Sequence, residues 1–207
     1  MLKKIRSLIS NSDFIEIYDN ALSAQECDIL IDLFKKSKKM PGLVVSGGKW
    51  KTKPEVKKGV EVEDLRFSNA DPISQIIRPA LFNAITGYVN KYPEFDNYLN
   101  EWTYSDNYTF KKFEEEDDGF KQWHCEHVPG CTSRILVWMF YLNDAKSGTD
   151  FMRFPTVRAK RGRVILWPAS WTHIHRSQLP NKGLKYIISG WVSYKYNTTP
   201  SRKLMDN

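Results

Sequence analysis

Residues 133–142 read SRILVWMFYL, a stretch of β-branched and aromatic residues that ends at the turn-forming Asn143. Such a composition between turn residues predicts a β-strand. Similar short segments surround it from about residue 100 onward, separated by Gly, Pro, Asn and Asp. They are residues 108–113, 122–127, 151–154, 163–167, 171–176 and 185–195. A series of short strands of this kind indicates a β-sandwich or a small barrel.

Helical patterns precede these strands. Ser23 and Glu26 have the spacing of a capping box, in which each side chain accepts a hydrogen bond from the other residue's backbone N–H, and an apolar stripe that begins at Cys27 follows. Asp71 and Pro72 offer an N-cap and a proline at the first position of a second, longer helix. We expect both helices to pack outside the barrel, which makes the fold class α+β and mostly β.

The chain of 207 residues has the length of a single domain, residues 1–207. We expect residues 13–100 to supply an N-terminal strand and the supporting helices, residues 101–196 to form the β core, and residues 197–207 to be a flexible tail. Residues 38–70 show no clear period and are expected to be a loop or a pair of irregular strands.

The composition argues for a soluble intracellular protein. Lys and Arg outnumber Asp and Glu by 31 to 24, but the two signs are interspersed, so no surface of a single sign is indicated. Cys27, Cys125 and Cys131 form no CxxC motif, which favours a reducing compartment. Because no apolar run has the length of a membrane helix or a secretion signal, we expect a cytoplasmic location and no membrane contact.

Residues 122–131, QWHCEHVPGC, bring together two imidazoles, thiols and a carboxylate, which are common ligands of transition metals. On a strand, residues i and i+2 point to one side, so His124 and Glu126 would share a face while Cys125 and His127 point away. Such a pair, completed by a distant histidine, can form the facial triad that binds Fe(II) and leaves the other face of the metal open.

His173 and His175 are the candidates for the distant ligand, because the chain has no other histidine after His127. Two other interpretations remain. The histidines could satisfy hydrogen bonds in the core, or the same side chains could bind the zinc ion of a hydrolase.

Seven short motifs, taken in order, resemble the Fe(II)- and 2-oxoglutarate-dependent dioxygenases, specifically the prolyl 4-hydroxylase-like branch that also occurs in phages and marine bacteria. The likeness runs from about Asp13 to Lys195. It rests on residues 14–34, 120–126 (FKQWHCE), 137–143 (VWMFYLN), 148–151 (GTDF), 160–168 (KRGRVILWP), 171–176 (WTHIHR) and 185–191 (KYIISGW). The resemblance implies a double-stranded β-helix, the jelly-roll barrel of cupins, with the N-terminal helices packed on one sheet. It also raises the expectation of a virus-encoded protein.

The resemblance implies a role for each candidate ligand. His124 and Glu126 would be the first two iron ligands, with Glu in place of the Asp that is usual in this branch. In the family a basic residue follows the distal histidine by about ten positions, and Lys185 lies ten residues after His175 and twelve after His173. This favours His175 as the third ligand, with His173 as the alternative, and the other histidine of the pair is expected to line the pocket.

The resemblance also implies a binding site for the cosubstrate. Lys185 would bind the far carboxylate of 2-oxoglutarate, an anion that compensates a buried ammonium. Tyr141 matches a family position whose hydroxyl binds the same carboxylate. By strand alternation Ser189 and Trp191 face the same side as Lys185, and Phe113 is expected on the opposite wall. A surface lysine and ordinary core packing are the alternative roles for these positions.

The implied reaction consumes 2-oxoglutarate and O2 at Fe(II), releases succinate and CO2, and hydroxylates an unactivated C–H bond, with ascorbate as a stimulant. The expected substrate is a prolyl residue of a peptide or protein, or else a small molecule such as a free amino acid. A nucleic-acid demethylase of the same superfamily would carry two arginines on the final strand, and residues 185–195 contain none. The non-enzymatic alternative is a cupin-like barrel that binds a metal or an anion. The sequence carries no sign of the oligomeric state.

Overall fold

The computed structural model describes residues 13–46, 49–63, 65–99 and 101–195. The tail expected at residues 197–207 lies outside the described residues. The elements in chain order are β1 (Glu16–Tyr18), α2 (Ala24–Lys36), β2 (Lys39–Pro41), β3 (Leu43–Ser46), β4 (Lys49–Thr52), β5 (Lys57–Lys58), β6 (Val60–Val62), α3 (Pro72–Lys91), α4 (Glu94–Tyr98), β7 (Trp102–Phe113), β8 (Gly119–Phe120), β9 (Arg134–Tyr141), β10 (Gly148–Phe151), β11 (Val157–Arg158), β12 (Arg163–Pro168), the 3-10 turn η1 (Trp171–His173), β13 (His175–Ser177) and β14 (Lys185–Tyr194).

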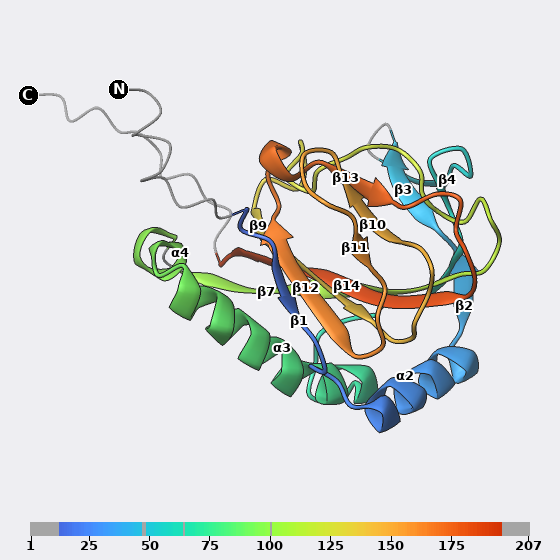
Figure 1. Ribbon diagram of the computed structural model, residues 1–207, viewed down its shortest axis with the longest axis horizontal. Helices are drawn as coiled ribbons and strands as arrows, with labels where there is room; N and C mark the ends of the chain where they lie inside the picture. Colours follow the sequence, from blue (N-terminus) through green and yellow to red (C-terminus); the bar gives the residue numbers. More distant parts are fainter. Residues whose placement is uncertain (1–12, 47–48, 64, 100, 196–207) are drawn as a thin grey trace, which may run out of the picture.

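Two antiparallel sheets form the walls of a barrel (Figure 1). The larger sheet has the strand order β1-β12-β9-β14-β7-β6-β2, and the smaller has the order β11-β10-β13. The helices α2 and α3 cover the outer side of the larger sheet, away from β10, β11 and β13 (Figure 1). The fold class is therefore the expected one, a mostly β double-stranded β-helix with helices packed on one sheet.

The alternation of residues on the strands explains why this sheet has two buried faces. On β9, Leu136, Trp138 and Phe140 pack in the core beneath the helices, as does Leu142 just after the strand, whereas Val137, Met139 and Tyr141 pack between the two sheets. Each fully buried side chain of this size contributes roughly 2 kcal/mol through removal of apolar area from water. The long apolar run of β9 is thus that of a strand with protein on both sides.

Both predicted helices are confirmed. The Ser23 hydroxyl accepts from the Glu26 N–H at 3.2 Å and the Glu26 carboxylate accepts from the Ser23 N–H at 2.8 Å, which completes the capping box of α2. The Asp71 carboxylate caps α3 by accepting from the N–H groups of Ile73 and Ser74. Cys27 is fully buried, as its place in the apolar stripe predicts. Within the described part of the chain, no helix combines the length and apolar character that crossing a membrane requires.

Two strand predictions are wrong in ways that affect the candidate metal ligands. Residues 122–127 form no strand, and only His124 pairs as an isolated bridge with His175, since the N–H groups of Glu126 and His127 both turn to the Ala169 carbonyl at 3.0 Å. Residues 171–176 are divided between the 3-10 turn η1 and the short strand β13. The 3-10 turn closes because the His173 N–H donates to the Ser170 carbonyl at 3.0 Å.

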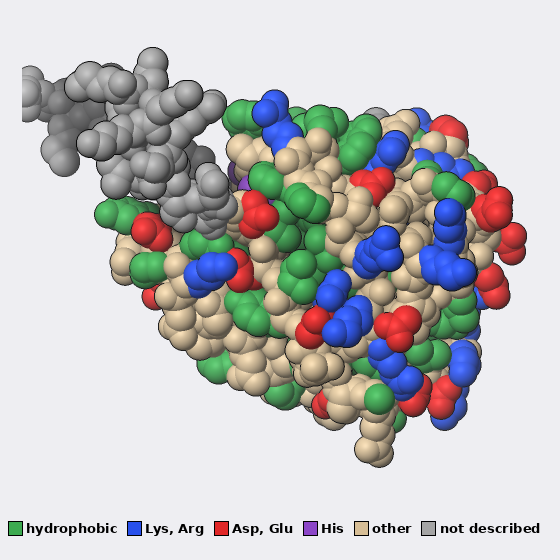
Figure 2. Space-filling model, viewed as in Figure 1, with side chains coloured by type: hydrophobic (Ala, Val, Ile, Leu, Met, Phe, Trp, Pro, Cys, Tyr) green, Lys and Arg blue, Asp and Glu red, His purple; other side chains and the backbone are tan. Residues whose placement is uncertain are grey.

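Two smaller differences concern the end of one strand and the structure of residues 38–70. The strand expected at residues 151–154 ends at Phe151 as β10. Residues 38–70 contain several short strands, of which β3 and β4 form a hairpin beside one end of the barrel (Figure 1). On the face shown in Figure 2, basic and acidic side chains are interspersed, as the composition predicts.

Candidate functional site

Three side chains converge at the wall of the barrel. One ligand atom from each of His124, Glu126 and His175 lies within 4.8 Å of the others. Oε1 of Glu126 lies 3.5 Å from Nε2 of His124 and 3.7 Å from Nε2 of His175. The backbone bridge between the two histidines sets this arrangement, and it does so without the regular strand that the sequence predicts around His124.

Both imidazoles are oriented by backbone carbonyls. Nδ1 of His124 lies 3.0 Å from the Gln122 carbonyl, and Nδ1 of His175 lies 2.9 Å from the His173 carbonyl. A carbonyl oxygen only accepts, so each Nδ1 carries a hydrogen and each Nε2 is the ring atom that faces the cluster and is available to a metal. The ring of His124 is further held by stacking on Phe120 at 3.7 Å between centroids.

The electrostatics of the three groups suit a divalent cation. Burial lowers the pKa of His175, which keeps its imidazole neutral. Burial alone would raise the pKa of Glu126, but hydrogen bonds and charge interactions with His124 and His175 hold it well below its usual range. Two imidazole nitrogens and a carboxylate oxygen are the donor set of a facial triad, so the residues present fit Fe(II).

Arg134 holds the second oxygen of the carboxylate. Its Nη1 donates to Oε2 of Glu126 at 2.9 Å, and its guanidinium lies 3.5 Å from the centroid of the Trp191 ring. Because Oε2 is occupied by Arg134, Oε1 is the oxygen that faces the two histidines. The Glu that stands where the resemblance predicts Asp thus contacts both histidines through one oxygen and the arginine through the other.

His173 lies outside this cluster. Its Nε2 lies 2.7 Å from the Asp13 carbonyl, its Nδ1 lies 2.8 Å from the Thr172 hydroxyl, and its ring stacks on Phe154 at 5.0 Å. Both ring nitrogens therefore have partners elsewhere. The expectation that the second histidine of the pair would line the pocket is wrong. His173 lies in the 3-10 turn, so its side chain does not share a strand face with His175 but points toward the segment before β1.

The other potential ligands of residues 122–131 lie outside the three-residue cluster, although Cys125 and Cys131 line the cavity. His127 is exposed, and its Nδ1 lies 3.2 Å from the Arg134 carbonyl. The Cys125 thiol lies 3.7 Å from the His127 carbonyl. Cys131 belongs to a turn, in which its N–H donates to the Val128 carbonyl at 2.8 Å. All three described cysteines are free thiols.

A cavity of about 960 Å³ extends from the cluster into the barrel. Its lining includes His124, Glu126 and His175 and every side chain predicted to bind the cosubstrate, which are Phe113, Tyr141, Lys185, Ser189 and Trp191. The expectation that Phe113 lies on the wall opposite Lys185 is wrong, because the two residues are direct partners on the neighbouring strands β7 and β14. The roles of these lining residues remain predictions.

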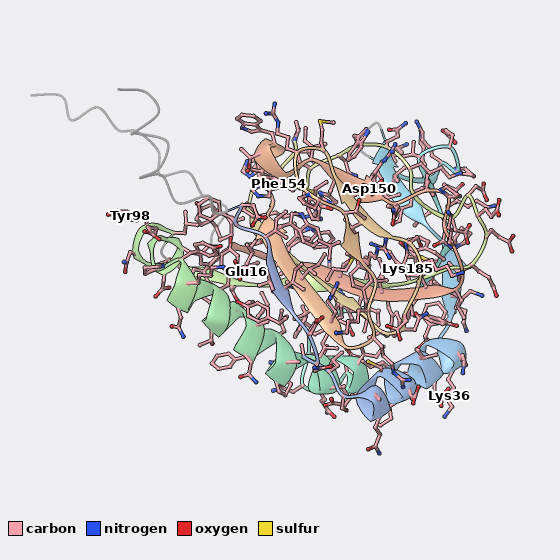
Figure 3. All side chains as sticks on the ribbon, in the orientation of Figure 1. Glu16, Lys36, Tyr98, Asp150, Phe154 and Lys185 are labelled. Atoms are coloured by element: carbon pink, nitrogen blue, oxygen red, sulfur yellow. The ribbon has the colours of Figure 1, made fainter. Side chains whose placement is uncertain are left out.

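Lys185 is the most deeply buried cation of the cavity, with 2% of its surface exposed. Its Nζ donates to the Ser147 hydroxyl at 3.3 Å and to the Gly148 carbonyl at 3.4 Å. Desolvation by burial lowers its pKa to about 8, and the partly exposed Asp150 on β10 opposes this shift only weakly (Figure 3). A buried ammonium with only neutral partners is a strong binding site for an anion.

Tyr141 lies in the same part of the cavity. Its hydroxyl lies 2.7 Å from the hydroxyl of Thr149, on the neighbouring sheet. Burial raises the pKa of Tyr141, so its hydroxyl stays protonated and can donate a hydrogen bond to an anion held by Lys185. The side chains of Lys185, Tyr141 and Thr149 together offer an ammonium and two hydroxyls.

The sequence reasoning missed Lys111 and Arg134, both of which line the cavity. Lys111 could have been predicted from the sequence. It lies two residues before Phe113 on a predicted strand, so the two side chains share a face, and Phe113 was already expected in the cavity wall. Arg134 had no such signal, since its contact with Glu126 depends on how the chain turns back after residue 127.

Comparison with known proteins supports this architecture. No family model matches the sequence, and no curated protein matches it either. Among solved structures, the chain is similar to a prolyl hydroxylase from Trichoplax adhaerens in complex with a hypoxia inducible factor peptide fragment, at a TM-score of 0.67 and 12% identity, covering 88% of this chain and 84% of that one. It is similar to a Pseudomonas putida prolyl-4-hydroxylase at a TM-score of 0.62 and 10% identity, covering 95% and 100%.

A third similar structure is the viral collagen prolyl hydroxylase of Paramecium Bursaria Chlorella virus-1 in its 2OG complex, at a TM-score of 0.58 and 15% identity, covering 90% of this chain and 99% of that one. At such low identities the likeness speaks for the fold alone. The chain has the double-stranded β-helix fold of prolyl hydroxylases and other 2OG-Fe(II) oxygenases.

Proposed function

We propose that this protein is an Fe(II)- and 2-oxoglutarate-dependent dioxygenase that hydroxylates an unactivated C–H bond, with a prolyl residue of a peptide or protein as its substrate. The overall reaction converts R–H, 2-oxoglutarate and O2 into R–OH, succinate and CO2. The observation that carries the proposal is the convergence of His124, Glu126 and His175 in the same cavity as the buried ammonium of Lys185.

The proposed metal ligands are His124, Glu126 and His175. When bound there, Fe(II) supplies a site for O2 activation coupled to the oxidative decarboxylation of 2-oxoglutarate. The carbonyl partners of Nδ1 direct both Nε2 atoms at the proposed metal position, and Arg134 keeps Oε1 of Glu126 directed at the same place. A facial set of three ligands leaves room on the metal for the cosubstrate.

The proposed cosubstrate site is formed by Lys185 and Tyr141. The ammonium of Lys185 binds the far carboxylate of 2-oxoglutarate, and the hydroxyl of Tyr141 donates to the same group. Phe113, Trp167 and Ile187 are buried apolar walls of the cavity, so they exclude water from the reacting atoms. The buried, unpaired ammonium favours this proposal over a zinc hydrolase, and turnover of 2-oxoglutarate distinguishes it from a barrel that only binds a metal or an anion.

The prolyl specificity rests on the solved structures with the same fold. Those reported above are named as prolyl hydroxylases, and one of them holds a peptide fragment. In this chain the β3–β4 hairpin and the cavity mouth beside it would receive the peptide, since Leu43 and Val44 of β3 line the cavity.

Two measurements test the proposal. Calorimetry under nitrogen should detect 2-oxoglutarate binding that requires Fe(II) and is lost in Lys185→Met. In air, with Fe(II), 2-oxoglutarate and ascorbate, proline-rich peptides should gain one oxygen atom by mass spectrometry. Absence of metal-dependent 2-oxoglutarate binding would exclude the dioxygenase. If 2-oxoglutarate binds and is converted to succinate but no peptide is oxidised, only the prolyl substrate is excluded.

A further inference from the structure

The cavity holds more positive charge than the proposed cosubstrate accounts for. Two of its cations are neutralised by carboxylates within the wall: Arg134 by Glu126 at 2.9 Å, and the buried Lys57 by the buried Glu61 at 2.5 Å. The ammonium of Lys185 has the far carboxylate of 2-oxoglutarate as its proposed partner. Three further cations line the cavity: Arg176 lies 3.7 Å from Asp150, Arg66 is exposed, and Lys53 lies in the turn after β4. Lys111 is the remaining cation on a barrel strand, and it forms an ion pair with none of the carboxylates that the structure describes.

Lys111 faces the interior of the barrel from β7. It lies between Ile187 of β14 and Glu61 of β6, its two cross-strand partners, and shares its face with Thr109 and Phe113. Its Nζ donates to the Ser189 hydroxyl at 3.2 Å, and that hydroxyl lies 2.9 Å from the hydroxyl of Thr109. One ammonium and two hydroxyls are therefore grouped on β7 and β14, and the carboxylate of the neighbouring Glu61 on β6 pairs with Lys57 instead.

The surroundings of Lys111 favour an incoming anion. The side chain is half-buried, with its exposed part open to the cavity, and desolvation lowers its pKa to about 8. The charges of Lys57 and Arg134 lower this pKa further, while Glu61 and Glu126 oppose them. Glu61 pairs with Lys57 and Glu126 with Arg134, so each carboxylate has another cation closer to it than Lys111. An anion beside Lys111 would compensate the cost of a desolvated ammonium.

The position of Lys111 separates it from the cosubstrate site. Lys185 lies opposite Phe113, which is two residues after Lys111 on β7. The spacing between strands and the rise per residue then place the Cα atoms of the two lysines at a distance of roughly 8 Å. The ammonium of Lys185 turns to Ser147 and Gly148 at β10, whereas that of Lys111 turns to Ser189, on the side of Trp191 and Arg134. The two ammoniums thus serve different parts of the cavity.

We propose that Lys111, Thr109 and Ser189 form a second anion subsite, which binds a carboxylate of the molecule that is oxidised. This inference rests on the proposed function and deepens it by naming the substrate class. The substrate carries a carboxylate close to the reacting C–H bond, as the carboxyl-terminal residue of a peptide does, or a free amino acid. For a prolyl substrate, the proline would be the last residue of its chain or proline itself.

Matched pairs of ligands test this subsite. Binding is measured by calorimetry under nitrogen to protein loaded with Fe(II) and 2-oxoglutarate, so that no turnover occurs. One pair is acetyl-Gly-Pro with a free carboxylate and the same peptide with a terminal amide, and the other is L-proline and L-prolinamide. In the wild type the acid of at least one pair should bind about tenfold more tightly than its amide, because the hydrogen bonds to a charged partner are lost in the amide. The pair that shows this preference identifies the source of the carboxylate.

The variants assign the preference to Lys111. In Lys111→Met the acid and the amide should bind alike, Lys111→Arg should retain the preference for the acid, and 2-oxoglutarate should bind as in the wild type. Lys112→Met is the matched control, since the neighbouring Lys112 points to the opposite side of β7, away from the cavity, and pairs with Glu114 at 2.6 Å. A melting curve of each variant verifies folding.

Three results would overturn the inference. One is equal binding, or no binding, of acid and amide by the wild type in both pairs. Another is a preference for the acid that survives in Lys111→Met. The last is a loss of 2-oxoglutarate binding in Lys111→Met as large as that in Lys185→Met, which would assign Lys111 to the cosubstrate. A wild type that binds no 2-oxoglutarate refutes the proposed function itself, and the subsite with it.

Discussion

His124 and His175 exchange two backbone hydrogen bonds: the His124 N–H donates to the His175 carbonyl at 3.0 Å, and the His175 N–H donates to the His124 carbonyl at 2.9 Å. This single antiparallel bridge joins a loop to the first residue of β13. It fixes the two imidazoles, whose ring centroids are 4.4 Å apart, on the same side of the barrel wall. The candidate metal centre thus depends on backbone pairing as well as on side-chain identity.

The first prediction concerns the third metal ligand. His175→Ala should lower the affinity for Fe(II) or Co(II) by more than about 100-fold, since even the loss of an outer partner of a ligand costs roughly 10- to 100-fold. His173→Ala should leave the affinity within a few-fold, because both nitrogens of His173 are bound to Asp13 and Thr172. Competition with a metal-binding dye measures both. Equal losses in the two variants would contradict the assignment.

The second prediction concerns Arg134. Arg134→Met should weaken metal binding by roughly tenfold, because the Glu126 carboxylate loses the partner that holds Oε2. The exposed Arg158 of β11 provides the control, and Arg158→Met should bind the metal as the wild type does. If Arg134→Met also binds the metal normally, the arginine does not position the carboxylate.

The third prediction concerns the stability of the ligand-free protein. The folded-state pKa of Lys185 is lowered to about 8 from an ordinary value of 10.5, so its ammonium is less favourable in the folded than in the unfolded chain. This destabilisation is fully present below about pH 8 and disappears as the pH rises toward 10.5. Lys185→Met should therefore stabilise the ligand-free protein at pH 7 by roughly 2 kcal/mol. Urea denaturation at pH 7 and at pH 10 measures this gain, which should be smaller at the higher pH.

The fourth prediction is the pH dependence of cosubstrate affinity. 2-Oxoglutarate requires the protonated form of Lys185, whose pKa in the free protein is about 8. Its affinity should therefore be nearly constant on the acid side of this value and fall as the pH rises above it, by up to tenfold per pH unit. Calorimetry between pH 7 and pH 9.5 tests the direction. An affinity that stays constant to pH 9.5 would mean that Lys185 is not the anion anchor.

The sequence could predict those features whose causes are local. The caps of α2 and α3 depend on residues three positions apart or fewer, and both form as expected. The wall residues Lys185, Ser189 and Trp191 follow from alternation along β14, and all three line the cavity.

Features that depend on long-range pairing were not predictable in the same way. The loop at residues 122–127 looks like a strand, but its N–H groups bind Ala169, a partner that no local pattern indicates. His173 and His175 have the spacing of residues on one strand face, yet the 3-10 turn separates them. The ion pair of Arg134 with Glu126 likewise arises only once the chain folds back.

The measurement that tests the central claim most directly is the formation of succinate from 2-oxoglutarate in air as Fe(II) is added. The wild type and His127→Ala should both produce succinate in proportion to bound iron, because His127 is exposed and faces the Arg134 carbonyl. His124→Ala should produce none above the level of free iron. Iron-dependent succinate formation by His124→Ala at the rate of the wild type, or its absence from the wild type itself, would contradict the account.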